Sequence, residues 1–352
     1  MNEDGPEAAP HPRSGAIITI AAVIVFGLVI AGFLVRADYS SLSPGPTTNM
    51  LDEITAKGVR TYPSHGKLLL TTVSVEDGPL SLIEIMRIWA GRNELIPPGA
   101  IRPPCTTDQQ NEAQNVADIE GSKLEAQLAA YQFLGFPAKR LKAERILGVV
   151  DGTPAKGKLK PGDVFAAVDG HPTPDQAAVV RWLRAKPSGS AVHVTVVRDG
   201  KRVSYTVRTE PSGPAMPGCE PPHPVIGITL GPDYRFPSSL TIDTGDVGGP
   251  SGGLVFTLAI IDKLTPGDLT QGHTIAATGQ IAVDDKGVAH VLPIGGIREK
   301  VASVVASGCD VFVVPKEDLK DALAVAPRSL TVIGVSTLRE AIAALARLPA
   351  RR

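Results

Sequence analysis

The longest hydrophobic pattern in the chain is an unbroken apolar run near its N-terminus. Residues 16–35 include no charged side chain, and a run of this length can cross a hydrocarbon core of about 30 Å as a helix. A buried core helix normally has a polar face, which this run lacks. A signal peptide has a basic leader, whereas acidic residues outnumber basic residues before this run. The pattern therefore predicts an uncleaved transmembrane helix.

Beyond this run, segments of strand period alternate with segments of helical period. The predicted strands are 67–75, 146–150, 164–168, 192–197, 203–207, 225–230, 239–242, 311–314 and 331–335, with a further β-pair around the turn at 284–287. The predicted helices are 81–92, 119–134, 174–185, one after Ser251, one from Ile297, 316–325 and a last helix opened by the capping box Thr337-x-x-Glu340. This mixture predicts an α+β fold. Proline-rich stretches at 96–104 and 211–224 divide it, because they continue neither helices nor central strands.

Composition and charge exclude several classes of function. The 352 residues are 43% hydrophobic, which is ample for packed cores, and the net charge of −1 argues against a nucleic-acid partner. The three cysteines show neither metal-ligand spacing nor a C-x-x-C pair. No phosphate-binding G-x-x-x-x-G-K-[ST] loop is present. We therefore expect no metal and no organic cofactor.

Ser251 stands in an unusual place, between Pro250 and two glycines and directly before an apolar run. A serine there is expected to cap a helix, but 249–253 also fits the G-x-S-x-G pattern of a nucleophile. Asp268 and His290 follow in the order of a hydrolase triad. Only 101 residues remain after the serine, which is short for the rest of such a sheet.

A lysine is the other known base for a serine nucleophile. Lys263 is twelve residues further along the same predicted helix, about 18 Å away, while Lys286, Lys316 and Lys320 lie in turn or charged contexts. Lys300 adjoins the apolar face of its predicted helix. An apolar setting of this kind is what lowers a lysine pKa from about 10.4 toward 7. Elimination therefore favours Lys300.

The segment GTPAKGKLKPGDVFAAVDG, at 152–170, resembles a bacterial PDZ domain. The resemblance extends over the block 143–210 and implies a domain that binds an extended peptide by adding it to a sheet edge. The alternative is that the block is only a structural spacer.

Three further motifs, GGPSGG, ATGQI and PIGGIREK followed by SGCDVFVVP, resemble the proteolytic domain of the Lon serine proteases. The resemblance implies that Ser251 is the nucleophile and Lys300 the general base, with Thr278 in a supporting position. Gly252 replaces the usual alanine. Gly248 stands where the family has an aspartate, so any role of that carboxylate is absent or moved to Asp246. The family's ATPase module is missing.

Together these features resemble the membrane-anchored Lon-like PDZ proteases of Gram-positive bacteria. The implied order is a cytoplasmic tail at 1–15, a transmembrane helix at 16–35, an extracytoplasmic region at 36–142, a PDZ domain at 143–210 and a Lon-type α/β proteolytic domain at 225–348. The expected function is ATP-independent serine endopeptidase activity on protein or peptide substrates, outside the cytoplasm and anchored in the lipid bilayer. The alternative is an inactive peptide-binding scaffold. Whether the chain forms a homo-oligomer is left open.

Two cysteines are informative about which side of the membrane the domains after the apolar run face. Cys105 and Cys219 both lie in proline-rich segments, and a disulfide between them would close a loop of about 114 residues, nominally worth roughly 4–5 kcal/mol. Such bonds persist in oxidising surroundings. Two exposed free thiols are the alternative. Cys309 is expected to be an ordinary buried thiol.

Overall fold

The computed structural model describes residues 13–37, 39–76, 78–91, 94–97, 105–213 and 217–351. The chain divides into two compact units, one made of 1–43 with 75–101 and the other of 44–74 with 102–352. Most of the predicted N-terminal tail and of the first proline-rich stretch lies outside the described residues.

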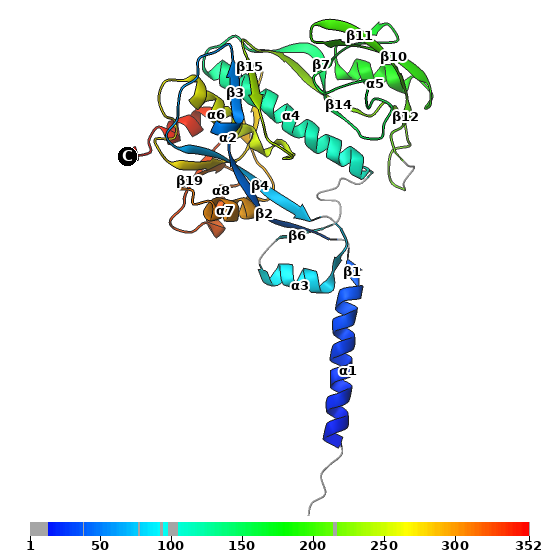
Figure 1. Cartoon of the computed structure of the whole chain (residues 1–352), viewed down its shortest axis with the longest axis vertical. Helices are drawn as coiled ribbons and strands as arrows, with labels where there is room; N and C mark the ends of the chain where they lie inside the picture. Colours follow the sequence, from blue (N-terminus) through cyan, green and yellow to red (C-terminus); the bar gives the residue numbers. More distant parts are fainter. Residues whose placement is uncertain are drawn as a thin grey trace, which may run out of the picture. The chain divides into compact units, whose positions relative to one another are not determined.

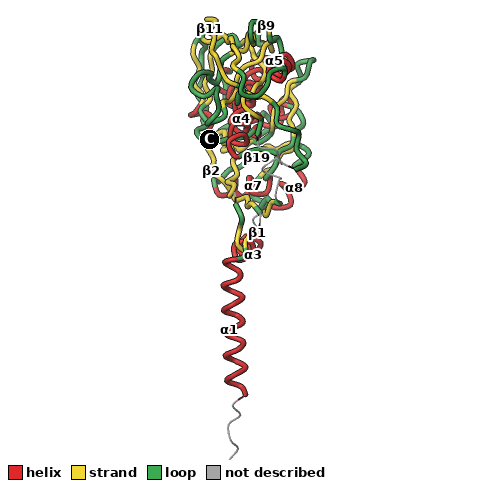
Figure 2. The backbone as a smooth tube through the Cα atoms, turned by 90° about the vertical axis from the view of Figure 1, so that its right-hand side faces the viewer, coloured by secondary structure: helices red, strands yellow, loops and turns green. Residues whose placement is uncertain are grey.

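The first unit contains the apolar helix α1 (Arg13–Leu34), which Figure 2 shows as one continuous helix. Its other elements are β1 (Arg36–Ala37), the start of β2 (Ser40–Asn49), β5 (Leu80–Ser81), α3 (Leu82–Gly91) and β6 (Glu94–Ile96). Strand β1 pairs with β5, and β6 pairs with the first residues of β2, both antiparallel. The segment Ile17–Leu34 of α1 is long and apolar enough to cross a membrane.

The second unit holds two large sheets. In the first, strands follow the order β20-β19-β16-β4-β2. The three pairings among β4 (Lys67–Glu76), β16 (Thr274–Ala277), β19 (Val311–Pro315) and β20 (Thr331–Val335) are all parallel. Central parallel strands are buried on both faces and therefore carry continuous apolar runs. All five residues of β19 are buried, which agrees with this rule.

Helices cover both faces of this sheet. Leu68 and Leu70 of β4 pack into the core formed with α2 (Met50–Glu53), α4 (Asp108–Phe133), α6 (Gly253–Leu264) and α9 (Leu338–Leu345). Leu69 points to the opposite face, where the core includes α7 (Ile297–Ala306) and α8 (Leu319–Val325). Two strand pairs flank these layers: β3 (Ile54–Lys57) with β15 (Ser239–Ile242), and β17 (Gln280–Val283) with β18 (Ala289–Leu292).

The second sheet follows the order β11-β10-β8-β7-β14. Its strands are β7 (Lys139–Val149), β8 (Val164–Val168), β10 (Ala191–Arg198), β11 (Lys201–Arg208) and β14 (Ile228–Arg235), with β9 (His171–Pro172) beside β8. Helix α5 (Gln176–Arg184) covers its core, and the short strands β12 (Glu210–Pro211) and β13 (Pro224–Val225) pair nearby. The predicted hairpin turn at Asp199-Gly200 is confirmed, since both residues have the positive φ that such turns need.

The region before residue 142 packs closely against the parts of the chain that follow it. The helix predicted at 119–134 begins at Asp108, where Thr107 and Gln110 form a capping box. Its first half is polar and carries little hydrophobic periodicity, so only the cap marks its start. Helix α4 packs against α6 and also against β7 and β14, and thus lies between the two large sheets (Figure 1). Strand β4 pairs with β16, so the first large sheet extends beyond the range 225–348 expected for the C-terminal domain.

The cysteines are arranged as predicted. Cys105 and Cys219 form a disulfide with their Cα atoms 5.7 Å apart, which joins the chain before α4 to the segment before β13. Cys309 is free and half-buried, and burial raises the pKa of its thiol to about 11.

Candidate active site

Ser251 lies in a short 3-10 turn, Pro250–Gly252, that leads directly into α6. Neither this turn nor α6 has a side-chain cap, so the expectation that the serine caps the helix is wrong. The turn starts from Gly249, whose φ of 85° suits glycine and strains other residues. The Ser251 carbonyl accepts hydrogen bonds from the Gly279 backbone at 2.9 Å and from Thr278 Oγ1 at 3.2 Å. The serine is therefore held at its backbone while its side chain is left for another partner.

Helix α4 supports the same turn from the other side. The Gly249 N–H donates to the carbonyl of Asn115 at 3.0 Å, and Ser122 Oγ donates to the carbonyl of Pro250 at 3.0 Å. A Cβ atom on Gly248 would lie 3.0 Å from the Cβ of Asn115. These contacts fix the position of the serine turn, and no sequence motif in α4 predicted them.

The glycines after the serine are required by close packing. A Cβ atom on Gly252 would lie 2.5 Å from Phe256 Cζ and 3.1 Å from Leu70 Cδ1. A Cβ atom on Gly253 would lie 2.7 Å from the backbone nitrogen of Ile281. The fully buried Phe256 ring thus occupies the space that an alanine at 252 would need. This packing explains why Gly252 stands where the Lon-type motif usually has an alanine.

Lys300 reaches the serine from α7. Its helix begins after Gly296, which has the left-handed conformation, and the Lys300 side chain is only 2% exposed. Lys300 Nζ donates to Ser251 Oγ at 2.7 Å and to Thr278 Oγ1 at 3.0 Å. Thr278 is fully buried and in turn donates to the Ser251 carbonyl. The structure therefore brings together the three residues that the sequence singled out, from three separate elements.

The environment favours the neutral form of the lysine. Burial lowers the pKa of Lys300 to about 8, and the negative charge of Asp318 partly opposes this effect. The Asp318 carboxylate is held by the Ile294 N–H at 3.0 Å, and burial raises its own pKa. With a pKa near 8, about a tenth of the amine is neutral at about pH 7. A neutral amine beside a serine hydroxyl can accept its proton.

The other candidate bases are placed elsewhere. His290 Nε2 contacts Asp284 at 3.1 Å in the turn between β17 and β18, and Asp268 is bonded within the loop after α6. Asp268 and His290 therefore do not form a triad with Ser251. Lys263 is half-buried, whereas Lys286, Lys316 and Lys320 are exposed.

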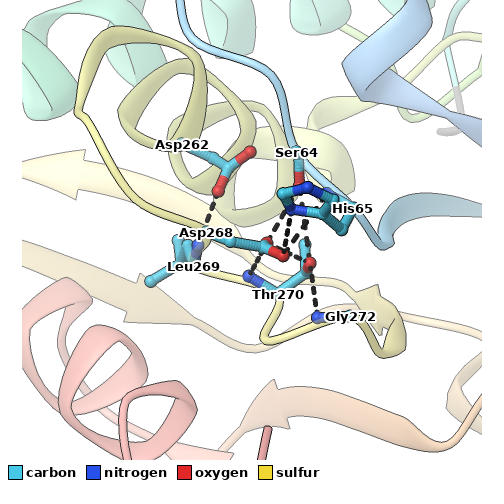
Figure 3. A network of polar contacts seen from close by, with 7 residues as sticks. All are labelled: Ser64, His65, Asp262, Asp268, Leu269, Thr270 and Gly272. Atoms are coloured by element: carbon cyan, nitrogen blue, oxygen red, sulfur yellow. Dashed lines mark hydrogen bonds and ion pairs between the residues drawn. The ribbon is translucent and has the colours of Figure 1, made fainter. Parts of the chain in front are cut away.

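A second group of serine, histidine and aspartate residues joins the segment before β4 to the loop after α6 (Figure 3). Ser64 Oγ and His65 Nδ1 both contact the carboxylate of Asp268, at 3.1 and 3.3 Å. The imidazole does not lie between the serine and the carboxylate, as a triad requires, and His65 is 81% exposed. Asp268 also accepts from the Thr270 N–H, and Asp262 accepts from the Leu269 N–H. The network fastens the loop after α6 to the segment before β4 and leaves its serine without a base.

Two cavities border strand β14 of the second sheet. One, of about 480 Å³, is bordered by α5 and by the segment 223–230. The other, of about 440 Å³, lies between α4 and β14 and reaches Pro250, Gln280 and Ile281 beside the serine turn. Three residues line both cavities, namely Gln114, Thr229 and Leu230. A continuous surface therefore leads from the α5 cavity to the neighbourhood of Ser251.

Comparisons with known proteins match two segments of the chain to family models. Residues 133–209 match the sequence model of the PDZ domain, and residues 244–346 match that of the Lon protease C-terminal proteolytic domain. The Lon protease of Chloroflexus aggregans is 36% identical over 104 residues, which are 28% of this chain and 12% of that protein. The Lon protease of Rhizobium meliloti is 38% identical over 106 residues, which are 29% of this chain and 12% of that protein.

Among solved structures, the PDZ domain of an SdrC-like protein from Listeria monocytogenes is 21% identical, with a TM-score of 0.22, and the match covers 25% of this chain and 87% of that one. The chain spans about 12% of the length of the curated Lon proteases it matches. Within this chain, the site described above lies in the segment that matches the Lon family. Residues 244–346 of this chain are therefore similar to the Lon proteolytic domain, and residues 133–209, which precede them, are similar to a PDZ domain.

Proposed function

We propose that this chain is a membrane-anchored serine endopeptidase in which Ser251 is the nucleophile and Lys300 the general base. The observation that carries the proposal is the 2.7 Å contact between Lys300 Nζ and Ser251 Oγ, made by a lysine whose pKa burial lowers to about 8. A lysine used only for packing or solubility keeps its ammonium in water. Here the amine ends against two hydroxyl groups inside the protein.

The proposed reaction proceeds in two steps. Neutral Lys300 takes the proton of Ser251 as Oγ attacks the peptide carbonyl, and the resulting ammonium returns the proton to the leaving amine. The acyl-enzyme is then hydrolysed by water, which Lys300 deprotonates in the same way. Thr278 orients the amine, because its hydroxyl accepts from Lys300 while it donates to the Ser251 carbonyl. Backbone N–H groups at the start of α6 are the proposed donors to the oxyanion, where the helix dipole also favours negative charge.

The PDZ domain is proposed to present substrate to this site. Its α5 cavity lies beside the edge of β14, where a peptide could be added as a strand. The residues shared by the two cavities connect this groove to the serine turn. A bound segment would thus have a short path over α4 toward Ser251.

The anchor and its orientation belong to the same proposal. Helix α1 has the length and composition of a single span. The Cys105–Cys219 disulfide favours an oxidising compartment for the peptidase unit, because such bonds are rare where thiols are kept reduced.

The experiment that tests the chemistry compares matched lysine variants of the full-length chain on an unfolded, fluorescence-quenched polypeptide. Ser251→Ala and Lys300→Arg should each lose activity by at least a thousandfold, since arginine does not give up its proton. Lys320→Arg, on the exposed face of α8, should keep it. Cleavage by Lys300→Arg would refute the proposed base. If the wild-type chain neither cleaves nor reacts with a fluorophosphonate probe, the inactive scaffold is the better description.

A second comparison tests presentation by the PDZ groove. Val180 lines the α5 cavity and is partly exposed, whereas Arg181 is exposed and does not line it. Val180→Glu should raise KM for protein substrates more than for short peptides, and Arg181→Glu should change neither. An equal rise for both substrates would indicate that the domain is a spacer.

A further inference from the structure

Helix α3 carries an apolar face that the described residues leave largely exposed. The side chains of Leu82, Met86 and Trp89 are 41%, 67% and 79% exposed. Their spacing of four and three residues puts them on one face of the helix. Glu84 and Arg87 are also exposed and lie about 140–200° around the helix from Leu82. The helix is thus amphipathic, and its apolar face is exposed.

The start of α3 is fastened to the end of α1. Strand β5, directly before α3, pairs with β1, directly after α1, and the Leu82 N–H donates to the Val35 carbonyl at 3.2 Å. Ser81 and Glu84 form reciprocal side-chain to backbone hydrogen bonds of 3.3 and 2.7 Å, the pattern of a capping box. A Cβ atom on Gly32 of α1 would lie 3.0 Å from Ile83, so the two helices are in close contact there.

The geometry relates α3 to the depth of a bilayer. With 22 residues, α1 is about 33 Å long, close to the thickness of the hydrocarbon core of about 30 Å. If α1 spans a membrane, its C-terminal end lies at the level of the headgroups, and Arg36 follows at once. Figure 1 shows α3 lying across the end of α1. An exposed apolar face on a helix at that level would be within reach of lipid.

We propose that α3 is an interfacial helix whose Leu82, Met86 and Trp89 side chains insert between the headgroups and the acyl chains of the bilayer that α1 crosses. The inference rests on the proposed membrane span. Lipid is the occupant that fits, because the exposed face is next to the end of an apolar helix that is itself almost entirely uncovered. Tryptophan is also the side chain most typical of the interface between membrane and water. Inserted in this way, α3 would add a second, reversible contact with the membrane beside the span.

The two tryptophans of the chain allow a direct test. Trp182 is in α5, where it stacks on His171 with ring centroids 3.8 Å apart, so Trp182→Phe leaves Trp89 as the only tryptophan. The full-length variant is reconstituted into phosphatidylcholine vesicles with or without bromine on the acyl chains. Contact with brominated lipid should reduce the fluorescence of Trp89 at least twofold. The Trp89→Phe variant, which retains Trp182, should show no change.

Variants on the two faces of α3 separate the alternatives. In the Trp182→Phe background, Met86→Asp should weaken quenching and Arg87→Gln should not. Trp89 that stays unquenched in a chain that floats with vesicles after alkaline extraction would overturn the inference while leaving the span intact. A chain that does not float would refute the span and α3 with it. Unquenched Trp89 whose emission shifts to the blue as protein density rises would assign the face to a second copy.

Discussion

The burial of Lys300 should make the stability of this protein depend on pH in a way that one substitution removes. Lys300→Met keeps an unbranched side chain of similar length but carries no charge. In the folded chain the ammonium is desolvated, which lowers the pKa from 10.5 to about 8. The folded state therefore binds the proton more weakly than the unfolded state, and folding of the wild type is penalised wherever the unfolded lysine is protonated.

The magnitude follows from the two pKa values. A fall of this size corresponds to roughly 3 kcal/mol, present almost in full below about pH 8. The penalty fades as pH rises from about 8 toward 10.5, because the unfolded lysine then also loses its proton. Between about pH 7 and pH 10 the free energy of unfolding of the wild type should therefore rise by roughly 2–3 kcal/mol relative to Lys300→Met. Solvent screening does not reduce this electrostatic effect, since the Lys300 side chain is only 2% exposed.

The assay is urea-induced unfolding followed by circular dichroism, on the full-length chain in detergent at about pH 7 and about pH 10. Comparing the wild type with Lys300→Met at the same pH cancels the contributions of the other titrating groups to stability. Comparing that difference between the two pH values cancels the cost of the hydrogen bonds that methionine cannot make. Lys320→Met provides the control: that ammonium is exposed on α8, so its difference from the wild type should be the same at both pH values. A Lys300→Met difference that changes by less than about 0.5 kcal/mol between the two pH values would refute the desolvated amine.

Three other predictions concern the same unit. Asp318→Asn should shift the acid limb of the pH profile of kcat/KM to lower pH, because the Asp318 charge raises the pKa of Lys300. Gly252→Ala should cost about 1–3 kcal/mol of stability through the clash with Phe256, and Phe256→Leu should recover part of it in the double variant. Cys219→Ser should lower the urea midpoint of the oxidised protein by an amount that prior reduction of the wild type reproduces, since the bond closes a separation of 114 residues.

Local sequence signals located most elements of the fold. The alternating segments predicted β10 and β11, and the Asp-Gly pair between them predicted their turn, because a two-residue turn depends on the conformational preferences of its own residues. The long apolar run predicted α1, because the ability of a helix to cross a membrane depends only on its own length and composition. The start of α4 was misplaced by eleven residues, because a polar helix that is held by distant partners has no apolar stripe of its own.

The residues of the candidate site were named from sequence, but their arrangement was not. The motifs around Ser251, Thr278 and Lys300 carried the resemblance to a known family, and elimination among the lysines pointed to the same base. The support from Asn115 and Ser122 of α4 had no local signal, because both act through single hydrogen bonds across more than a hundred residues of chain.

Local sequence patterns were enough to find an apolar run long enough for a span, a PDZ-like segment, a serine in a glycine turn and a lysine on a partly apolar helix. Each of these depends on residues close together in the chain. The tertiary structure alone decided that β4 completes the sheet beside β16, that α3 is fastened across the end of α1, and how deeply Lys300 is buried. The physical reason is that strand pairing and desolvation are properties of everything that surrounds a residue in space. The pKa of Lys300 falls because several distant elements together exclude water from its amine, and no single stretch of sequence contains that environment.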